Sequence, residues 1–420
     1  MYAKTTLPSG LRIVTEQLSH VRSATIGVWA DVGSSAERAE QRGISHLIEH
    51  MLFKGTTRRS TREIAETMDG VGAQMNAFTD KEQTCYYARV IDTHVELAID
   101  VLADMYQHPV FEPDDLAREQ SVVLEEIKMY DDSPDEMIHD LFIQTMWEGS
   151  NLGAPTIGYA ETVSAQSPDD LRAYMRERYA PNTTLVAVAG NVEHERIVEL
   201  VARHFSEFSG SVTPPVPDVP ALRPAQVVRA KDSEQAYLCL GTRGLAMNHD
   251  RKYALAMLDT ILGGGMSSRL FQEIREKRGL VYSVYTFQQA YRGAGLFGVY
   301  AGTSPKNAPE CIKVVCEELS SMASRGPTDA ELTLAKEHVK GSLTLSLESS
   351  SNRMIRLGRD EFSLGRRVDP QEIIESIDAV QREDVTALAH ELFATGQLGL
   401  CVLGPVDADD VRLDRPAAVA

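Results

Sequence analysis

Two histidines and a glutamate form the group in this sequence that is best suited to chemistry. His46 and His50 are four residues apart, and Glu49 lies between them. The segment 45–53 has the apolar pattern of a buried helix, with Ser45 as its expected N-terminal cap. Residues four apart share a helix face, so both imidazoles can bind one metal ion while Glu49 reaches a water molecule on it. Because HxxEH is the inverted form of a zinc motif, we expect a catalytic zinc site here.

A third protein ligand is needed, because catalytic zinc usually has three. The segment 119–127 offers carboxylates: Glu119 and Glu126 lie seven residues apart on one helix face, which also carries Val122 and Val123. Carboxylates among apolar side chains are costly to bury unless a cation compensates. A zinc ion would provide that compensation, so this segment is the expected source of the third ligand.

The alternative is a pair of surface histidines, in a chain with 11 of them, beside a solvated acidic face. The residues around the two histidines argue against it, because they predict a buried helix in which unpaired histidines are unfavourable. These neighbours are Leu47, Ile48, Met51, Leu52 and Phe53.

The bulk properties limit the partners and the location. The chain has 420 residues, which favours two or more domains. With 61 acidic and 42 basic residues the net charge is −19, so nucleic acid and anionic membranes are not expected partners. The start lacks the pattern of a secretory signal, and no apolar run approaches the ~18 residues of a membrane span. Five scattered cysteines indicate reduced packing residues, and we expect a cytoplasmic protein.

A proline-rich segment divides the chain near its middle. Four prolines lie between 214 and 220, which predicts an extended linker over 209–224. The expected domains are therefore 1–208, which would bind zinc, and 225–420.

The two halves echo each other in sequence. The segments 168–171 and 185–192 resemble 382–385 and 399–406 at an offset of 214, and Leu116 matches Leu332 at an offset of 216. This repeat predicts two copies of one domain. Strands are expected at 11–15 and 24–30, and helices at 95–105 and 114–129. We expect an α+β fold of two homologous domains, each an antiparallel-type sheet packed with helices, that form a clam-like cleft.

Nearly the whole chain resembles the pitrilysin-type (M16) zinc peptidases with the inverted motif. It is most similar to the bacterial relatives of the β subunit of the mitochondrial processing peptidase. Three segments carry the likeness, namely 43–56 around the histidines, 76–79 (Asn-Ala-Phe-Thr) and the glycine-rich 262–271. Gly263, Gly264 and Gly265 are not followed by the lysine of a phosphate loop, so a gate or turn is expected there.

The resemblance implies roles for individual residues. The family's third zinc ligand lies about 76 residues after the second histidine, which selects Glu126 over Glu125 and gives one zinc ion per chain. Glu119 matches a family glutamate seven residues earlier, which would orient a ligand histidine or hold charge near the zinc. Arg275 and Tyr282 match a pair from the second half that would hold the peptide and stabilise the oxyanion; the alternatives are a surface arginine and a core tyrosine.

Asn76 and Ala77 match the family's substrate-binding strand edge, where peptides bind by β-augmentation; the alternative for Asn76 is a turn residue. At the offset of 216, Ala335 and Ser342 replace Glu119 and Glu126. The second half would therefore bind no zinc in this way and would act as a substrate clamp.

The expected activity is a zinc-dependent endopeptidase for unfolded peptides or presequence-like segments, with Glu49 as the general base. Two alternatives remain open: a non-catalytic member of the superfamily, and an active subunit that needs a different partner chain. The likeness to half of the four-domain, single-chain members implies a homodimer or a heterodimer with a related subunit.

Overall fold

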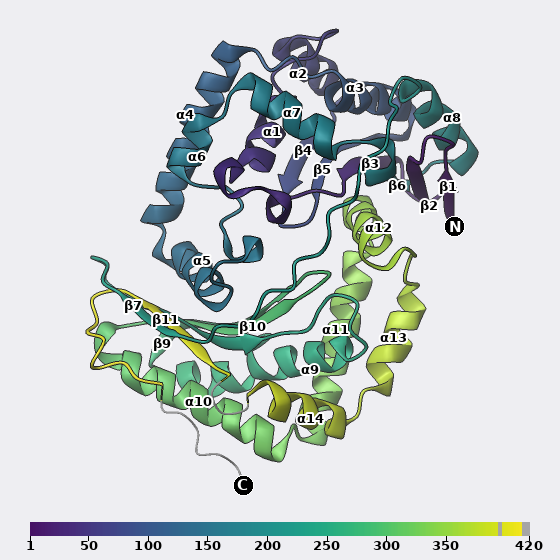
Figure 1. Cartoon of the computed structure of the whole chain (residues 1–420). Helices are drawn as coiled ribbons and strands as arrows, with labels where there is room; N and C mark the ends of the chain where they lie inside the picture. Colours follow the sequence, from purple (N-terminus) through teal and green to yellow (C-terminus); the bar gives the residue numbers. More distant parts are fainter. Residues whose placement is uncertain (394–396, 414–420) are drawn as a thin grey trace. The chain divides into compact units, whose positions relative to one another are not determined.

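The computed structural model describes residues 1–393 and 397–413, which form two compact units (Figure 1). Each unit contains one β-sheet with helices packed on both faces. The mixed fold with two sheets that the sequence predicts is therefore confirmed. Unit 1 comprises Met1–Ile127, Ala154–Val216 and Leu345–Arg367, and unit 2 comprises Lys128–Gly153, Pro217–Thr344 and the described residues after Arg367.

The strands of unit 1 are β1 (Tyr2–Thr6), β2 (Arg12–Gln17), β3 (Ser23–Ala30), β4 (Gln74–Thr79), β5 (Thr84–Ile91) and β6 (Thr184–Gly190). Their order in the sheet is β1-β2-β6-β3-β5-β4. All neighbouring strands of this sheet are antiparallel except β2 and β6, which are parallel. The sheet is therefore mainly antiparallel, as the sequence predicts. The central strands β3 and β6 are buried almost throughout, whereas β4 lies at an edge.

Helices from the first half of the chain cover one face of this sheet. Side chains of α1, α3, α7 and α8 share one apolar core with β3, β5 and β6, because each helix has an apolar stripe that must be buried. The helices are α1 (Ile44–Leu52), α2 (Thr61–Asp69), α3 (Val95–Gln107), α4 (Pro113–Asp132), α6 (Ala160–Ala165), α7 (Pro168–Arg178) and α8 (His194–His204).

The opposite face is covered by α12 (Ser350–Leu364), which comes from the second half of the chain (Figure 1). Its Gly358 passes so close to Trp29 that a Cβ there would lie 2.3 Å from the indole. The buried carboxylate of Glu361 anchors the same helix to the first two strands. Its partners are Lys4, at 2.7 Å, and Arg12, at 3.2 Å.

Unit 2 repeats this plan. Its sheet has the order β7-β11-β8-β10-β9, with β7 and β11 as its parallel pair. The strands are β7 (Gln226–Arg229), β8 (Ala236–Arg243), β9 (Val281–Ala290), β10 (Gly295–Thr303) and β11 (Gly399–Leu403). The helices are α9 (Lys252–Gly263), a π-helical segment (Phe271–Glu276), α10 (Ala308–Arg325), α11 (Asp329–Ser346), α13 (Pro370–Ala379) and α14 (Arg382–Leu392), with α5 (Pro134–Met146) on the other face.

The two units therefore match element by element. Strands β2, β6, β3, β5 and β4 occupy the same places as β7, β11, β8, β10 and β9, and α1 and α4 correspond to α9 and α11. The strand that unit 2 lacks among its described residues is a counterpart of β1. This agreement in topology supports the internal duplication that the sequence predicts.

Each unit also uses a helix from the opposite half of the chain. Helix α5 precedes the linker in sequence but packs on β8 and β11, whereas α12 follows the linker but packs on β2, β3 and β6. The domain boundary at 209–224 stays a prediction, because each spatial unit contains residues from both halves of the chain. Residues 209–224 contain no helix or strand. No helix within 1–393 and 397–413 is long and apolar enough to cross a bilayer.

Candidate metal centre

Helix α1 carries the two histidines and Glu49. It buries Ile44, Leu47, Ile48, Met51 and Leu52 against the core and leaves the histidines and Glu49 half-buried on its other side. Its N-terminal flanking residue is Gly43, with a φ of 94°, which favours glycine. The expectation that Ser45 caps the helix is wrong, because the helix begins at Ile44. The Ser45 hydroxyl instead lies 2.9 Å from that of Tyr174.

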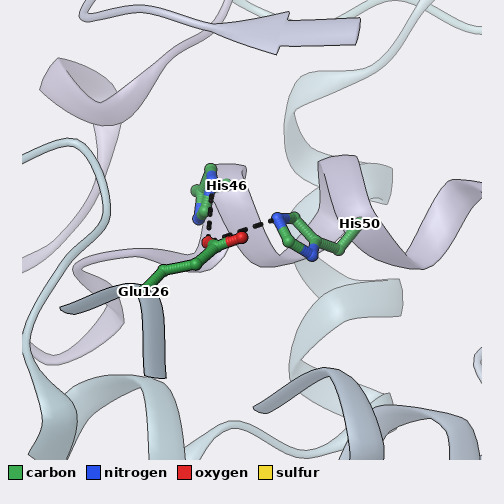
Figure 2. Close-up of side chains that lie close together, drawn as sticks. All are labelled: His46, His50 and Glu126. Carbon is green, nitrogen blue, oxygen red and sulfur yellow. Dashed lines mark ion pairs between the residues drawn. The ribbon is translucent and has the colours of Figure 1, made fainter. Parts of the chain in front are cut away.

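The structure brings His46, His50 and Glu126 together (Figure 2). Oε2 of Glu126 lies 3.9 Å from Nε2 of His46 and 3.7 Å from Nε2 of His50. The three donor atoms all lie within 4.8 Å of one another. A tetrahedral zinc ion with bonds of about 2.1 Å holds its donors about 3.4 Å apart. The spacings from Glu126 to the two histidines exceed this value by a few tenths of an ångström, and the spacing between the two imidazoles exceeds it by at most about 1.4 Å. Modest shifts of the side chains would therefore let the three share one ion.

The surroundings of these atoms also fit a cation. Oε2 of Glu126 is buried, and within the described residues it has no hydrogen-bond partner although it faces both imidazoles. An acceptor in that position is unfavourable unless a cation or donor compensates it. Burial and the neighbouring His50 lower the pKa of His46 to about 4. His46 is therefore neutral near pH 7, which is the form that ligates metals.

Glu119 lies behind His50. Its Oε2 is 3.1 Å from Nδ1 of His50, and its Oε1 is 2.6 Å from Nζ of Lys54. A carboxylate that accepts the Nδ1 proton leaves Nε2 of His50 as the free donor toward a metal. Lys54 was not expected from the sequence, because it lies two residues beyond Leu52, where α1 ends, and helix spacing does not place it.

Glu49 combines burial with access to the same centre. Burial raises its pKa, whereas the Thr79 hydroxyl and His50 oppose this shift. Thr79 ends strand β4, so the carboxylate lies between the two histidines and the edge of the sheet. A raised pKa brings a carboxylate closer to the range in which it can accept and return a proton near neutral pH.

Strand β4 is the edge strand next to α1. It pairs with β5 on one side, and it is the last strand in the order of the described sheet. Asn76 and Ala77 lie within this strand, so the alternative of a turn residue is wrong for Asn76. The side-chain oxygen of Asn76 accepts the backbone N–H of Ala77 at 2.8 Å. An edge of this kind can pair with an extended peptide.

Arg275 and Tyr282 lie together in unit 2. The guanidinium of Arg275 stands over the Tyr282 ring at 5.6 Å. Tyr282 is 78% exposed, so the alternative of a core tyrosine is wrong. The pairing of β9 with β10 shifts between Ser283 and Val281, which leaves Tyr282 unpaired in a β-bulge. A bulge turns a side chain away from the regular face of a strand.

The position in unit 2 that is equivalent to Glu119 carries no carboxylate. Ala335, on α11, corresponds to Glu119 and lines a pocket of about 300 Å³. The exposed Gly264 and Gly265, which follow the end of α9, line the same pocket. Among the described residues, His46, His50 and Glu126 form the one group able to hold a metal ion.

Two family models match successive parts of the chain, and relatives match nearly all of it. Residues 12–159 match the model described as "Insulinase (Peptidase family M16)", and residues 166–339 match the model described as "Peptidase M16 inactive domain". The chain is 43% identical to the uncharacterised zinc protease YmxG of Bacillus subtilis, over 96% of this chain and 98% of that one. An uncharacterised zinc protease of Streptomyces coelicolor is 44% identical, over 96% and 89% of the two chains.

Two solved structures share the fold. The peptidase M16 inactive domain from Pseudomonas fluorescens superposes with a TM-score of 0.91 at 21% identity, and covers 97% of this chain and 98% of that one. A protease from Helicobacter pylori also gives a TM-score of 0.91, at 24% identity, over 96% and 99% of the two chains.

Proposed function

Because this chain belongs to peptidase family M16, we propose that it is a zinc-dependent endopeptidase whose reaction takes place in unit 1. One observation carries the proposal: the buried Oε2 of Glu126 has no partner among the described residues and faces Nε2 of both His46 and His50. Two neutral imidazoles and a carboxylate are the donor set of many catalytic zinc sites. One ion per chain would satisfy this group.

His46, His50 and Glu126 would hold the ion, and Glu119 would keep His50 in the required tautomer. Bound zinc acts as a Lewis acid that polarises a peptide carbonyl and acidifies water. The chain itself supplies the proton transfers. Glu49 takes a proton from water as the water oxygen bonds to the scissile carbon, and returns it to the leaving nitrogen as the C–N bond breaks.

The substrate is an unfolded or presequence-like peptide, because an edge strand binds extended chains through main-chain hydrogen bonds. β4 would hold the peptide beside Glu49, with Asn76 and Ala77 on the contacting strand. In this proposal Arg275 and Tyr282 of unit 2 reach the bound peptide, where their donors anchor it and stabilise the developing oxyanion. Unit 2 then acts as a substrate clamp.

The proposal also includes an oligomeric state and a cellular location. A homodimer, or a heterodimer with a related subunit, would complete the enzyme, because the chain resembles half of the four-domain, single-chain members. Light scattering of the protein expressed alone distinguishes self-association from the need for another chain. The cytoplasmic location stays a prediction.

The alternative function is that of a non-catalytic member of the family. The presence of His46, Glu49, His50 and Glu126 in one chain favours the enzyme. We expect Glu49→Gln to keep about one zinc ion per chain and to lose roughly 100- to 10,000-fold in cleavage of a fluorogenic peptide. A wild-type protein that binds no zinc and cleaves no peptide would contradict the proposal. Full activity in Glu49→Gln would contradict the role of Glu49.

A further inference from the structure

A second carboxylate contacts the helix that bears the histidines, at its N-terminal end. Glu37 follows the short 3₁₀ turn Ser34–Ala36 and is 2% exposed. Its Oε2 accepts the backbone N–H of Gly43, and its Oε1 accepts the backbone N–H of Ser45, both at 2.8 Å. One side chain from outside the helix thus satisfies two N–H groups at the start of α1.

This contact replaces a cap that the local sequence does not supply. The first N–H groups of a helix have no partner within the helix, and Gly43 has no side chain to accept them. A carboxylate at this end also interacts favourably with the helix dipole. Glu37 therefore holds the start of α1 through Gly43 and Ser45, which lie three residues and one residue before His46.

The same end of the helix has little freedom to move. A Cβ at Gly43 would lie 2.6 Å from the carbonyl oxygen of Ile157 and 2.9 Å from Val163, and the φ of Gly43 is positive. The backbone of Gly43 is therefore packed closely against a neighbouring segment. Together with the two hydrogen bonds to Glu37, this packing determines where the first turn of α1 begins.

The turn before Glu37 is also attached to the loop between β4 and β5. The N–H of Ser34 donates to the carbonyl of Asp80 at 3.1 Å, and the N–H of Ser35 donates to that of Lys81 at 2.8 Å. Lys81 is buried, and its charge favours the ionised form of Glu37. Glu37 thus connects the histidine helix to the hairpin that contains the proposed peptide-binding edge.

We infer that Glu37 is a positioning residue, which holds α1 in register with the β4–β5 hairpin so that the metal ligands, Glu49 and the bound peptide meet correctly. The inference rests on the proposed function. It assigns to Glu37 no contact with metal or substrate. Its effect passes through the backbone of Gly43 and Ser45.

The cost of this arrangement supports a functional role. Burial raises the pKa of Glu37 to about 7, although the two backbone N–H groups, the Ser45 side chain and Lys81 oppose the shift. The negative charge of Glu37 also acts on two phenols, those of Tyr174 in α7 and of Tyr179 directly after it. A carboxylate that is costly to ionise is more readily explained by a task in a site than by stability alone.

The test measures zinc affinity in Glu37→Gln by competition with a chelator, under conditions in which circular dichroism shows the protein folded. We expect a dissociation constant for zinc about tenfold weaker than in the wild type. At saturating zinc, kcat should fall while KM for a peptide changes little, because ligands and base are displaced but the strand edge is intact. Glu37→Asp keeps the charge with a shorter reach and should weaken zinc binding in the same direction, by a smaller factor.

The matched control is Glu361→Gln, which also neutralises a buried carboxylate of unit 1, but one that pairs with Lys4 and Arg12 on the far face of the sheet. It should lower the unfolding midpoint and leave the zinc dissociation constant unchanged. Unchanged zinc affinity in both folded Glu37 variants would overturn the inference and leave the proposed function intact. Failure of the wild type to bind zinc would overturn the proposed function itself.

Discussion

Oε2 of Glu119 lies 3.1 Å from Nδ1 of His50, on the side of the imidazole opposite Glu126. Both carboxylates come from α4, seven residues apart, and both reach the same ring of α1. Lys54, 2.6 Å from Glu119, balances the buried charge. Two turns of one helix therefore supply a proposed ligand and the group that orients a second ligand.

Replacement of Glu119 should weaken metal binding without removing it. Glu119→Gln loses the charge-assisted hydrogen bond to Nδ1 of His50, so the correct tautomer of His50 is less favoured. Groups that orient a metal ligand typically contribute 10- to 100-fold in affinity or activity. We expect a loss of that size in chelator competition. Glu112→Gln, an exposed glutamate just before the same helix, is the control and should bind zinc as the wild type does.

Two adjacent glutamates give a direct test of the third ligand. Glu126→Gln should abolish stoichiometric zinc binding at micromolar protein, because one of three protein ligands is lost. Glu125→Gln changes the neighbouring residue in the same way and should keep its zinc. Metal analysis of both proteins after dialysis decides the assignment. The reverse pattern would make Glu125 the ligand.

The clamp residues of unit 2 should affect catalysis but not metal content. Removal of one donor to an oxyanion costs roughly 100-fold in kcat, so Tyr282→Phe should lose about that much. Tyr285→Phe, on the same strand, removes a hydroxyl that lies 3.0 Å from Nε2 of His139 and should have little effect. Normal zinc content in both variants is part of the expectation. Equal activities of the two would argue against a role for Tyr282.

Alanine substitutions at two helix glycines should change the stability of the protein in opposite directions, because one glycine is closely packed and the other is not. Gly358→Ala places a methyl group 2.3 Å from Trp29 and should destabilise the protein by about 1–3 kcal/mol. Gly341→Ala, in α11, meets nothing within 4 Å and should stabilise by about 0.5–1 kcal/mol through helix propensity. Thermal unfolding of the two proteins provides the comparison. A neutral Gly358→Ala would show that this helix is not tightly packed.

Acid should weaken an ion pair of unit 2. Hydrogen bonds from Arg269 lower the pKa of Glu331 from 4.5 to about 2. Since the folded-state pKa is depressed, ionised Glu331 stabilises the fold above about pH 4.5, and this contribution is lost as the pH falls toward 2. Arg269→Met should therefore lower the unfolding temperature most near pH 6 and less near pH 3.

This measurement is best made on metal-free protein, so that release of zinc in acid does not contribute. Lys313→Met, which breaks an exposed pair with Glu310 on α10, is the control and should have a small effect at both values of pH. A constant difference between wild type and Arg269→Met from pH 6 to pH 3 would contradict the assignment to Glu331.

Much of the local structure could be predicted because it depends on residues close in sequence. The apolar periodicity at 114–129 and 95–105 is that of α4 (113–132) and α3 (95–107), and the strand expected at 24–30 is β3 (23–30). Spacing four residues apart on a helix places His46 beside His50 in any fold that keeps the helix. The choice of Glu126 needed the family spacing, since periodicity alone does not specify which segment approaches α1.

Features that depend on contacts between residues far apart in sequence could be seen only in the tertiary structure. The exchange of α5 and α12 between units requires each sheet to bury its second face, and no local pattern states which helix will cover it. Glu37 replaces Ser45 as the acceptor at the start of α1 because the chain turns back between them. Tyr282 is exposed because a bulge in the pairing of β9 turns it outward, whereas its sequence context is that of a buried strand. Sequence periodicity specifies the faces of helices and strands, and packing specifies which faces meet.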